Sequence, residues 1–341
     1  PWYSYNSTGE YKGMWANAVT VKDTNRQTYL SATPGTTISM DDITTMWVWI
    51  PRFNAVTPSN YNGGTQSKPN AIDVTFVKQN ETAIDAFTFG NKELSGFWYG
   101  KFEIGGSLAS SCTNETCNVS NIVVKPNVSS LRSQKVSSFF YASRSMEQAG
   151  NSFGFVNSEV DTHMSKNNEW GAVAYLTQSI YGRCTSSTTC TEIGINNNSS
   201  YITGYGAPAG SSSSVTNGTY NTTLGKDAST TGTIYGIYDM SGGAWEYVMG
   251  VYSNTISSSG FSSLPDTKYY NNYTGSSYTG HALTETKKWY GDNDGFVSAS
   301  YPWFARGGYY GAGGVTGVFY FSSYDGNYIN SHSSHLVISN E

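Results

Sequence analysis

The sequence predicts an α+β fold, on three observations. Residues 15–21, 46–50 and 71–77 are short runs rich in β-branched and aromatic side chains, so each is expected to form a strand. Residues 165–176 carry apolar side chains at helical spacing, with Trp170, Val173 and Ala174 on one face. Aromatic residues make up 15% of the chain and charged residues only 13%, against about 25% in an ordinary soluble domain. The chain therefore has enough aromatic surface for a core, with long polar loops around it.

The predicted elements divide the 341 residues into two parts. Residues 1–68 are expected to form a β-rich N-terminal segment that ends in a loop rich in Pro, Gly, Asn and Ser. Residues 69–341 are expected to form the main domain. Within it, the helix at 165–176 has Ser165 as a possible cap and Glu169 in its first turn, where the helix dipole favours an anion. The polar stretch 182–232 is too long for an ordinary connection and is expected to be a surface excursion or flexible insert.

Charge and cysteine usage exclude some classes of partner and compartment. The net charge of −5 disfavours nucleic acid, because phosphate binding needs a basic face. Cys112 with Cys117, and Cys184 with Cys190, form two local pairs in Ser- and Thr-rich stretches. Zinc ligation is the alternative, but neither spacing is CxxC and no His is near. Two short disulfides are favoured, and with them an exported protein.

No apolar run approaches the roughly 18 residues that span a bilayer. Any membrane anchor or filament-forming helix is therefore expected to lie upstream of Pro1.

The tail, residues 303–338, combines a regular frame with variable-looking positions. The frame comprises 306–308, 317–319, Phe321 and 336–338, and between these lie mostly Tyr, Ser, Asn, Asp, His, Thr and Ala. Tyr supplies large contact area at low entropic cost, and small polar residues supply adaptable hydrogen bonds, as in binding surfaces. The expected ligand contacts are Tyr309, Tyr310, Ala312, Tyr320, Ser322, Ser323, Tyr324, Asp325, Asn327, Tyr328, Asn330, Ser331, His332 and Ser333.

The tail also lacks five residue types. Lys, Glu, Gln, Met and Trp make up 47 of the 341 residues, so about five are expected in the 37-residue window from Phe304 to Asn340, and none occurs. These are the residues that an Asn codon cannot reach when only its adenines are substituted. The alternative interpretation is an ordinary Gly-, Tyr- and Ser-rich surface loop.

Four blocks of the sequence resemble the formylglycine-generating-enzyme (sulfatase-modifying-factor) family. Residues 96–104 (GFWYGKFEI) are similar to its "YxxGKYEVTN" strand and 165–176 to its "PTEAEWEYAA" helix. Residues 236–247 (GIYDMSGGAWEY) match its "GLYDMxGNVWEW" hallmark, and 306–308 complete the set. The tail resembles the variable proteins of diversity-generating retroelements, in which adenine-directed mutagenesis rewrites Asn-rich positions. Both resemblances imply a C-type lectin fold, with small twisted antiparallel sheets, two helices and extensive loops.

The family resemblance also implies a structural Ca²⁺ site. In that family the hallmark motif can hold the ion through its first side chain, two backbone carbonyls and the Glu, and hard oxygen ligands suit calcium. The matching positions are Asp239, Gly242, Ala244 and Glu246. The alternative is that Glu246 is a buried hydrogen-bonding residue, and no cofactor is expected to be required.

Catalysis is not expected. Formylglycine generation needs cysteines near the Arg-Gly-Gly segment to hold copper, and no Cys follows Cys190. His332 and His335 are spaced as a possible metal pair but have no third ligand in the sequence, so exposed binding-surface residues are the preferred interpretation. Asp292 and Asp294 resemble part of a calcium loop without its final Glu, so an ordinary turn is favoured.

These observations together predict a surface-displayed binding protein of the adhesin or receptor type. It is expected on a bacterial cell surface, in the extracellular space or on a phage. Its partner is expected to be a protein or glycan on another cell, host or phage surface. Three alternatives remain open: a structural or pilin-like filament subunit, a calcium-dependent lectin, and an enzyme of the formylglycine-generating type.

Overall fold

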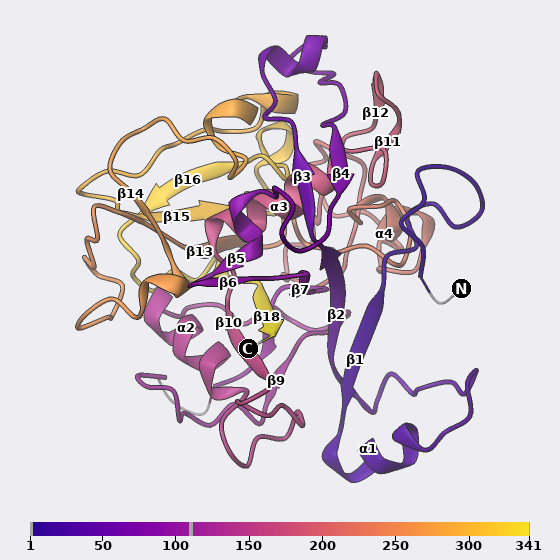
Figure 1. Cartoon of the computed structure of the whole chain (residues 1–341), viewed down its shortest axis with the longest axis vertical. Coiled ribbons are helices and arrows are strands. Elements are labelled where there is room, and N and C mark those ends of the chain that lie inside the picture. The colour runs from indigo at the N-terminus through magenta and orange to yellow at the C-terminus, as the bar shows by residue number, and fades with distance from the viewer. Residues whose placement is uncertain (1–2, 109–111, 341) are drawn as a thin grey trace.

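The structure, a computed structural model, describes residues 3–108 and 112–340. It is a mixed α+β chain of small sheets and a few short helices, joined by long loops (Figure 1). The α+β prediction is confirmed. No helix in these two ranges is long and apolar enough to cross a membrane.

One antiparallel sheet contains the first and the last strand of the chain. Its strands lie in the order β1 (Asn17–Val21), β2 (Ile43–Pro51), β7 (Gly96–Gly100), β18 (Leu336–Asn340) and β10 (Val160–Met164). The predicted strands at 15–21 and 46–50 are thus confirmed. Within the expected N-terminal segment 1–68, β2 pairs with β7 of the main domain. Its side chains share one buried cluster with the tail.

The second sheet carries the tail. Its strand order is β14 (Asn271–Tyr273), β13 (Trp245–Tyr252), β15 (Trp303–Arg306) and β16 (Phe321–Tyr324), and β17 (His332–Ser333) pairs with β13. β13 pairs antiparallel with β15 but parallel with β14 and β17. The parallel contact joins residues 245–246 directly to 332–333, far along the chain.

The remaining elements are short. The two-stranded ladders are β3 (Phe53–Ala55) with β4 (Val74–Phe76), β5 (Thr88–Phe89) with β6 (Lys92–Glu93), β8 (Gly105–Gly106) with β9 (Ile122–Val123), and β11 (Cys184–Ser186) with β12 (Thr189–Cys190). The α-helices are α1 (Asp23–Leu30), α2 (Val136–Ser145), α3 (Asn167–Thr177) and α4 (Thr223–Asp227). The 3₁₀ turns are η1 (Asn60–Gly63), η2 (Asp85–Phe87), η3 (Thr267–Tyr269), η4 (Thr284–Thr286), η5 (Trp289–Gly291) and η6 (Gly313–Val315).

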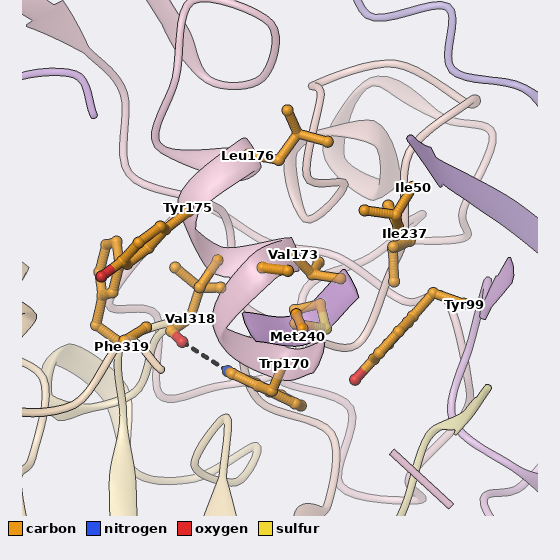
Figure 2. Close-up of a cluster of buried hydrophobic side chains, with 14 of the residues drawn as sticks. Ile50, Tyr99, Trp170, Val173, Tyr175, Leu176, Ile237, Met240, Val318 and Phe319 are labelled. Atoms are coloured by element: carbon orange, nitrogen blue, oxygen red, sulfur yellow. Dashed lines mark hydrogen bonds between the residues drawn. The ribbon is translucent and has the colours of Figure 1, made fainter. Parts of the chain in front are cut away.

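Helix α3 confirms the helix predicted at 165–176 and is buried along its whole length. Trp170 donates from its indole nitrogen to the Val318 carbonyl at 2.9 Å, so the helix is tied directly to the tail (Figure 2). The predicted cap is wrong. Ser165 pairs its hydroxyl with that of Tyr99 at 2.9 Å, while the Glu169 carboxylate accepts the Lys166 backbone N–H at 2.8 Å. A carboxylate in the first turn satisfies one of the free N–H groups there.

The stretch 182–232 is not a loose excursion throughout. Its polar residues Asn196, Asn197 and Thr203 are buried, as are Ile193 and Ile195. The polar composition predicted exposure of this stretch. The side chains of Asn196, Asn197 and Thr203 can be buried because they form hydrogen bonds inside the molecule.

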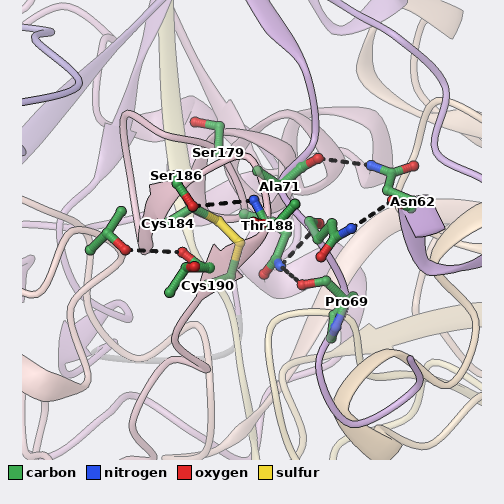
Figure 3. Close-up of a disulfide and its surroundings, with 12 residues drawn as sticks. Asn62, Pro69, Ala71, Ser179, Cys184, Ser186, Thr188 and Cys190 are labelled. Atoms are coloured by element: carbon green, nitrogen blue, oxygen red, sulfur yellow. Dashed lines mark hydrogen bonds between the residues drawn. A yellow bond between two sulfur atoms is a disulfide. The ribbon is translucent and has the colours of Figure 1, made fainter. Parts of the chain in front are cut away.

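Both disulfides predicted from the sequence are present, Cys112–Cys117 and Cys184–Cys190. The second closes the β11–β12 hairpin, in which the two cysteines lie opposite each other (Figure 3). Next to it, the Ala71 N–H donates to the Ser187 carbonyl at 2.9 Å, so the hairpin is anchored to the loop that precedes β4.

Candidate functional site

The frame of the tail is buried. Arg306, at the end of β15, is fully buried and donates to the Asn167 side-chain oxygen at 3.0 Å and to the Ala282 carbonyl at 2.8 Å. Burial lowers the pKa of Arg306 to about 10. No carboxylate among the described residues forms an ion pair with it, so neutral oxygens hold the guanidinium in place.

Two glycines then turn the chain toward the surface. Gly307 and Gly308 have φ of +78° and +72°, which L-residues with side chains rarely adopt. A Cβ at Gly308 would lie 2.6 Å from the Thr316 hydroxyl oxygen, so the close approach also needs glycine. The turn places Tyr309 and Tyr310 beside β13, where the Tyr310 N–H donates to the Gly243 carbonyl at 2.9 Å.

The turn completes a cluster of half-buried rings that we call the aromatic surface: Trp245, Tyr309, Tyr310, Tyr324 and Tyr201. Trp245 and Tyr309 stack with ring centroids 4.2 Å apart. Tyr310 lies edge-on to Tyr309 at 5.2 Å and to Tyr201 at 5.0 Å. Tyr324 lies 6.1 Å from Trp245. Such ring pairs stabilise one another while leaving edges and hydroxyl groups available to a ligand.

Arg132 extends this surface. Its guanidinium lies 3.9 Å from the Tyr201 ring centroid, and it also donates to the Asn330 carbonyl. A cation over an aromatic face is an attractive arrangement that fixes the side chain. The aromatic surface therefore has a positive charge at one end.

Most of the predicted contacts lie where a ligand could reach them. Tyr328 is 62% exposed and Asn330 is exposed. The half-buried residues among them are Tyr309, Tyr310, Ala312, Ser322, Ser323, Tyr324, Asp325 and Asn327.

Four predicted contacts are buried, and the prediction is corrected for them. Ser331 and Tyr320 are 8% and 6% exposed, and His332 and Ser333 are 0% exposed. His332 and Ser333 form β17 and pair with β13, which removes them from the surface. Tyr320 instead supports the aromatic surface from below, because its hydroxyl accepts the Trp245 indole N–H at 3.0 Å.

The His332 side chain packs against aromatic rings and does not serve as a polar ligand contact. Its centroid lies 4.4 Å from that of Tyr324, 4.6 Å from Tyr247 and 5.3 Å from Trp245. Neither ring nitrogen has a hydrogen-bond partner among the residues that the structure describes, and burial lowers the pKa of His332 to about 3. The imidazole is therefore neutral and fills space beneath the aromatic surface.

Sequence reasoning missed Trp245, Tyr201 and Arg132 as surface residues. Trp245 was seen only as part of the hallmark motif. Trp245 begins β13, and the next six residues of this strand are all buried, so no alternation along the strand distinguishes Trp245 as a surface residue. Tyr201 and Arg132 lie in separate loops, and no local pattern links them to the tail.

The side chains expected to bind calcium contact other groups of the protein. The Asp239 carboxylate already accepts from the Asn196 amide at 2.8 Å and from the Gly204 N–H at 2.9 Å. Glu246 pairs with His335. Within the described ranges, no three His, Cys, Asp or Glu side chains are arranged to hold a metal ion. Glu246 is thus a buried hydrogen-bonding residue, and the binding of Ca²⁺ by Asp239, Gly242, Ala244 and Glu246 stays a prediction.

Beneath the aromatic surface, the motif contributes to what we call the uncompensated cluster: Glu103, Asp239, Glu246 and His335, all 0% exposed. Its carboxyl groups bond to neutral donors, including the Ala244 N–H, which Glu103 accepts at 2.8 Å. Burial and mutual repulsion raise the pKa of Glu103 and of Glu246 well above the ordinary value. Burial lowers the pKa of His335 to about 4. Nearly neutral acids and a neutral imidazole are the state that this environment favours.

The other metal candidates are also separated. His335 bonds to Glu246, whereas His332 has no hydrogen-bond partner in the described part of the chain. Asp292 accepts the Phe319 N–H at 3.0 Å, and Asp294 pairs with Lys287 at 2.7 Å. The turn interpretation of 292–294 is thus the better one.

No family model matches the chain, and neither does any curated protein. Among solved structures it is similar to Major Tropism Determinant M1 Variant, with 15% identity, 95% of this chain and 71% of that chain covered, and a TM-score of 0.34. It is similar to Treponema denticola variable protein 1, with 12% identity, 89% of this chain and 99% of that chain covered, and a TM-score of 0.37. It is also similar to PvdO from Pseudomonas aeruginosa, with 9% identity, 91% of this chain and 100% of that chain covered, and a TM-score of 0.39.

Proposed function

We propose that this chain is a ligand-binding protein of the adhesin or receptor type, built on a C-type lectin fold. It acts outside the cell, on a bacterial surface or carried by a phage, and its target is a protein or glycan on another cell or host surface. The two disulfides support an exported protein, because such bonds persist in oxidising compartments.

One observation carries the proposal: the tail ends in a half-buried array of rings fixed to a buried frame. The Trp245–Tyr309 stack is held by the Trp245 indole bond to Tyr320 below it. Rigid aromatic anchors surrounded by Ser and Asn give large contact area with little loss of side-chain freedom on binding. This chemistry suits recognition of a macromolecular surface, and binding rather than catalysis is the role that we propose.

Cell binding tests the proposal directly. The labelled chain would be incubated with a panel of bacterial strains and binding measured by flow cytometry. Tyr309→Ala and Tyr324→Ala are expected to reduce binding to a retained strain at least about tenfold, as loss of an aromatic anchor does. Tyr301→Ala is the matched control, since Tyr301 is 55% exposed but lies outside the aromatic surface. Equal losses in all three variants would contradict the proposal.

Chelation separates this function from a calcium-dependent lectin. We propose that binding needs no metal cofactor, because the side chains expected to hold calcium are engaged with protein groups. EDTA is therefore expected to leave cell binding unchanged. Binding that disappears with EDTA and returns with Ca²⁺ would support the lectin alternative instead.

We further propose that the tail is diversified by a retroelement. The exposed and half-buried positions sit between buried frame residues, so substitutions at them cost little stability. The test is the gene neighbourhood, where a near-copy of the tail's coding sequence that differs only at adenines is expected beside a reverse transcriptase. A tail that is identical in many independent isolates, without such a copy, would remove this part of the proposal.

A further inference from the structure

A second aromatic site lies on elements remote in sequence from the tail loops. It is a cavity of about 410 Å³ lined by Trp49 of β2, Trp98 of β7, Tyr3 and Tyr5 of the N-terminal stretch, and Asn340 at the end of β18. We call it the indole groove. β2, β7 and the C-terminal end of β18 lie close together in Figure 1. The groove shares no residue with the aromatic surface.

The two indoles are held in fixed positions. Trp49 and Trp98 are directly opposed across β2 and β7, and their ring centroids are 5.2 Å apart. A Cβ at Gly96 would lie 2.5 Å from the Trp49 ring, so the indole packs directly against the Gly96 backbone. Tyr5 forms a fixed wall, because its hydroxyl donates to the Trp49 carbonyl at 2.7 Å and accepts the Ala16 N–H at 3.2 Å.

Their polar groups are left available. The indole N–H groups of Trp15, Trp47 and Trp303 donate to protein oxygens at 3.2, 2.7 and 3.1 Å. Those of Trp49 and Trp98 have no acceptor within residues 3–108 and 112–340. Since both rings are half-buried, the groove presents apolar ring faces together with hydrogen-bond donors.

A polar hollow of about 510 Å³ shares Asn340 with the groove, and its polar lining also includes Gln79, Asn80, Lys92 and Glu93. Primary amides both donate and accept hydrogen bonds, which matches hydroxyl groups. A peptide could add as a strand only at a free sheet edge, and β2, β7 and β18 each have strands on both sides.

We propose that the indole groove binds a neutral oligosaccharide. One pyranose ring places its C–H face on the Trp49–Trp98 pair, and its hydroxyls bond the indole N–H groups and Asn340. The next sugar occupies the amide-lined hollow. Cavities of several hundred Å³ with aromatic walls and a few convergent polar groups are typical small-ligand sites.

The test begins with the intact chain on a printed array of defined oligosaccharides that includes glucan, mannan and N-acetylglucosamine oligomers. The oligomer retained most strongly is then titrated by calorimetry. Trp98→Ala is expected to weaken its binding at least about tenfold and Trp98→Phe less, because Phe keeps a ring but loses the N–H. Trp245→Phe is the matched control and is expected to leave this affinity unchanged.

A second measurement keeps the proposal testable if Trp98→Ala does not fold. In the wild-type chain labelled with ¹⁵N-tryptophan, the oligomer is expected to shift the indole signals of Trp49 and Trp98 and not that of Trp245. Retention of no oligosaccharide, binding that survives Trp98→Ala, or shifts confined to Trp245 would each overturn the proposal. The last outcome would assign the sugar to the aromatic surface and leave the proposed cell binding intact.

Discussion

Two buried histidines in this molecule have opposite electrostatic environments. His163 lies between two carboxylates, with Asp161 3.0 Å from one ring nitrogen and Glu169 3.0 Å from the other. Arg144 pairs with Asp161 at 2.9 Å, and Lys166 lies 3.5 Å from Glu169. His335 also contacts a carboxylate, Glu246, but in its cluster no Lys or Arg within the described residues forms an ion pair. We call the first group, which comprises Arg144, Asp161, His163, Lys166 and Glu169, the compensated cluster.

The cations decide which groups carry charge. Burial by itself disfavours every charged form, and in the compensated cluster the opposite charges outweigh it. The charge of Glu169 and the hydrogen bond to Asp161 raise the pKa of His163, while His163 and Arg144 lower the pKa of Asp161. In the uncompensated cluster burial prevails, and the pKa values move in the opposite directions. A buried acid and histidine therefore form an ion pair only where further charges balance them.

The largest expected effect comes from removing the buried cation Arg144, which also pairs with Glu147 at 2.7 Å. Arg144→Met removes the cation that Asp161 and Glu147 share and leaves Glu147 with hydrogen bonds from Thr162 in place of an ion pair. The variant is expected to destabilise the fold by about 3–5 kcal/mol. Urea denaturation would measure this. Arg26→Met is the control at an exposed pair with Asp23, where a loss below about 1 kcal/mol is expected. Similar losses in both variants would contradict the importance of the compensated cluster.

Replacing one acid in each cluster by its amide sharpens the comparison. Glu169→Gln removes the charge that balances His163 and Lys166, so a loss of about 3 kcal/mol is expected at pH 7. Glu246→Gln replaces an acid that is already largely neutral with a group of the same shape, so a change below about 1 kcal/mol is expected. If the two losses are equal, Glu246 is ionised and the contrast fails.

The loss of a single hydrogen bond should also cost more stability in the compensated cluster than in the uncompensated cluster. Tyr269 donates its hydroxyl to the charged Asp161 at 2.8 Å, whereas the Ser130 hydroxyl donates to Glu103 in the other cluster. Tyr269→Phe is expected to cost about 2 kcal/mol and Ser130→Ala about 1 kcal/mol, because hydrogen bonds to charged groups are stronger. Thermal denaturation monitored by circular dichroism would rank the pair, and the reverse order would show that Glu103 carries the charge.

The smallest effect is a difference in pH dependence. A carboxyl whose folded pKa is raised stabilises the fold fully below its unfolded pKa of about 4.3, and this stability is lost as pH rises through the folded pKa. Glu246 follows this rule, and so does His163 from its unfolded value of about 6.5. Asp161 and Glu169, with lowered pKa values, lose their contribution as pH falls instead.

Unfolding free energies of the wild type and Glu246→Gln, measured from pH 5 to pH 9, would isolate the uncompensated cluster. The variant is expected to lose less stability than the wild type as pH rises, because one raised carboxyl has been removed. Parallel curves would mean that Glu246 does not titrate in this range.

Local patterns predicted the parts of the fold that local forces specify. Strands β1 and β2, helix α3 and both disulfides follow from periodicity and spacing. Helix α1 was not predicted, since it has no buried residue and little apolar periodicity.

The failures concern long-range contacts. His332 reads as an exposed polar residue, and only the parallel pairing with Trp245 buries it. Arg132 and Tyr201 join the aromatic surface because the fold brings three distant loops together. No single stretch of sequence shows that these residues meet. The pairing of Arg144 with Asp161 beside His163 is likewise a contact that only the fold reveals.

The contact of Arg132 and Tyr201 with the tail limits what a changing tail can achieve. Mutagenesis confined to codons 303–338 leaves those two side chains as they are, and Arg132 stays bound to the Asn330 carbonyl, which every residue at that position provides. Under the diversification that we propose, each version of the surface would therefore keep the same positive charge and the same phenol ring at one end. The different versions would then favour targets that present an acidic or electron-rich group at that place.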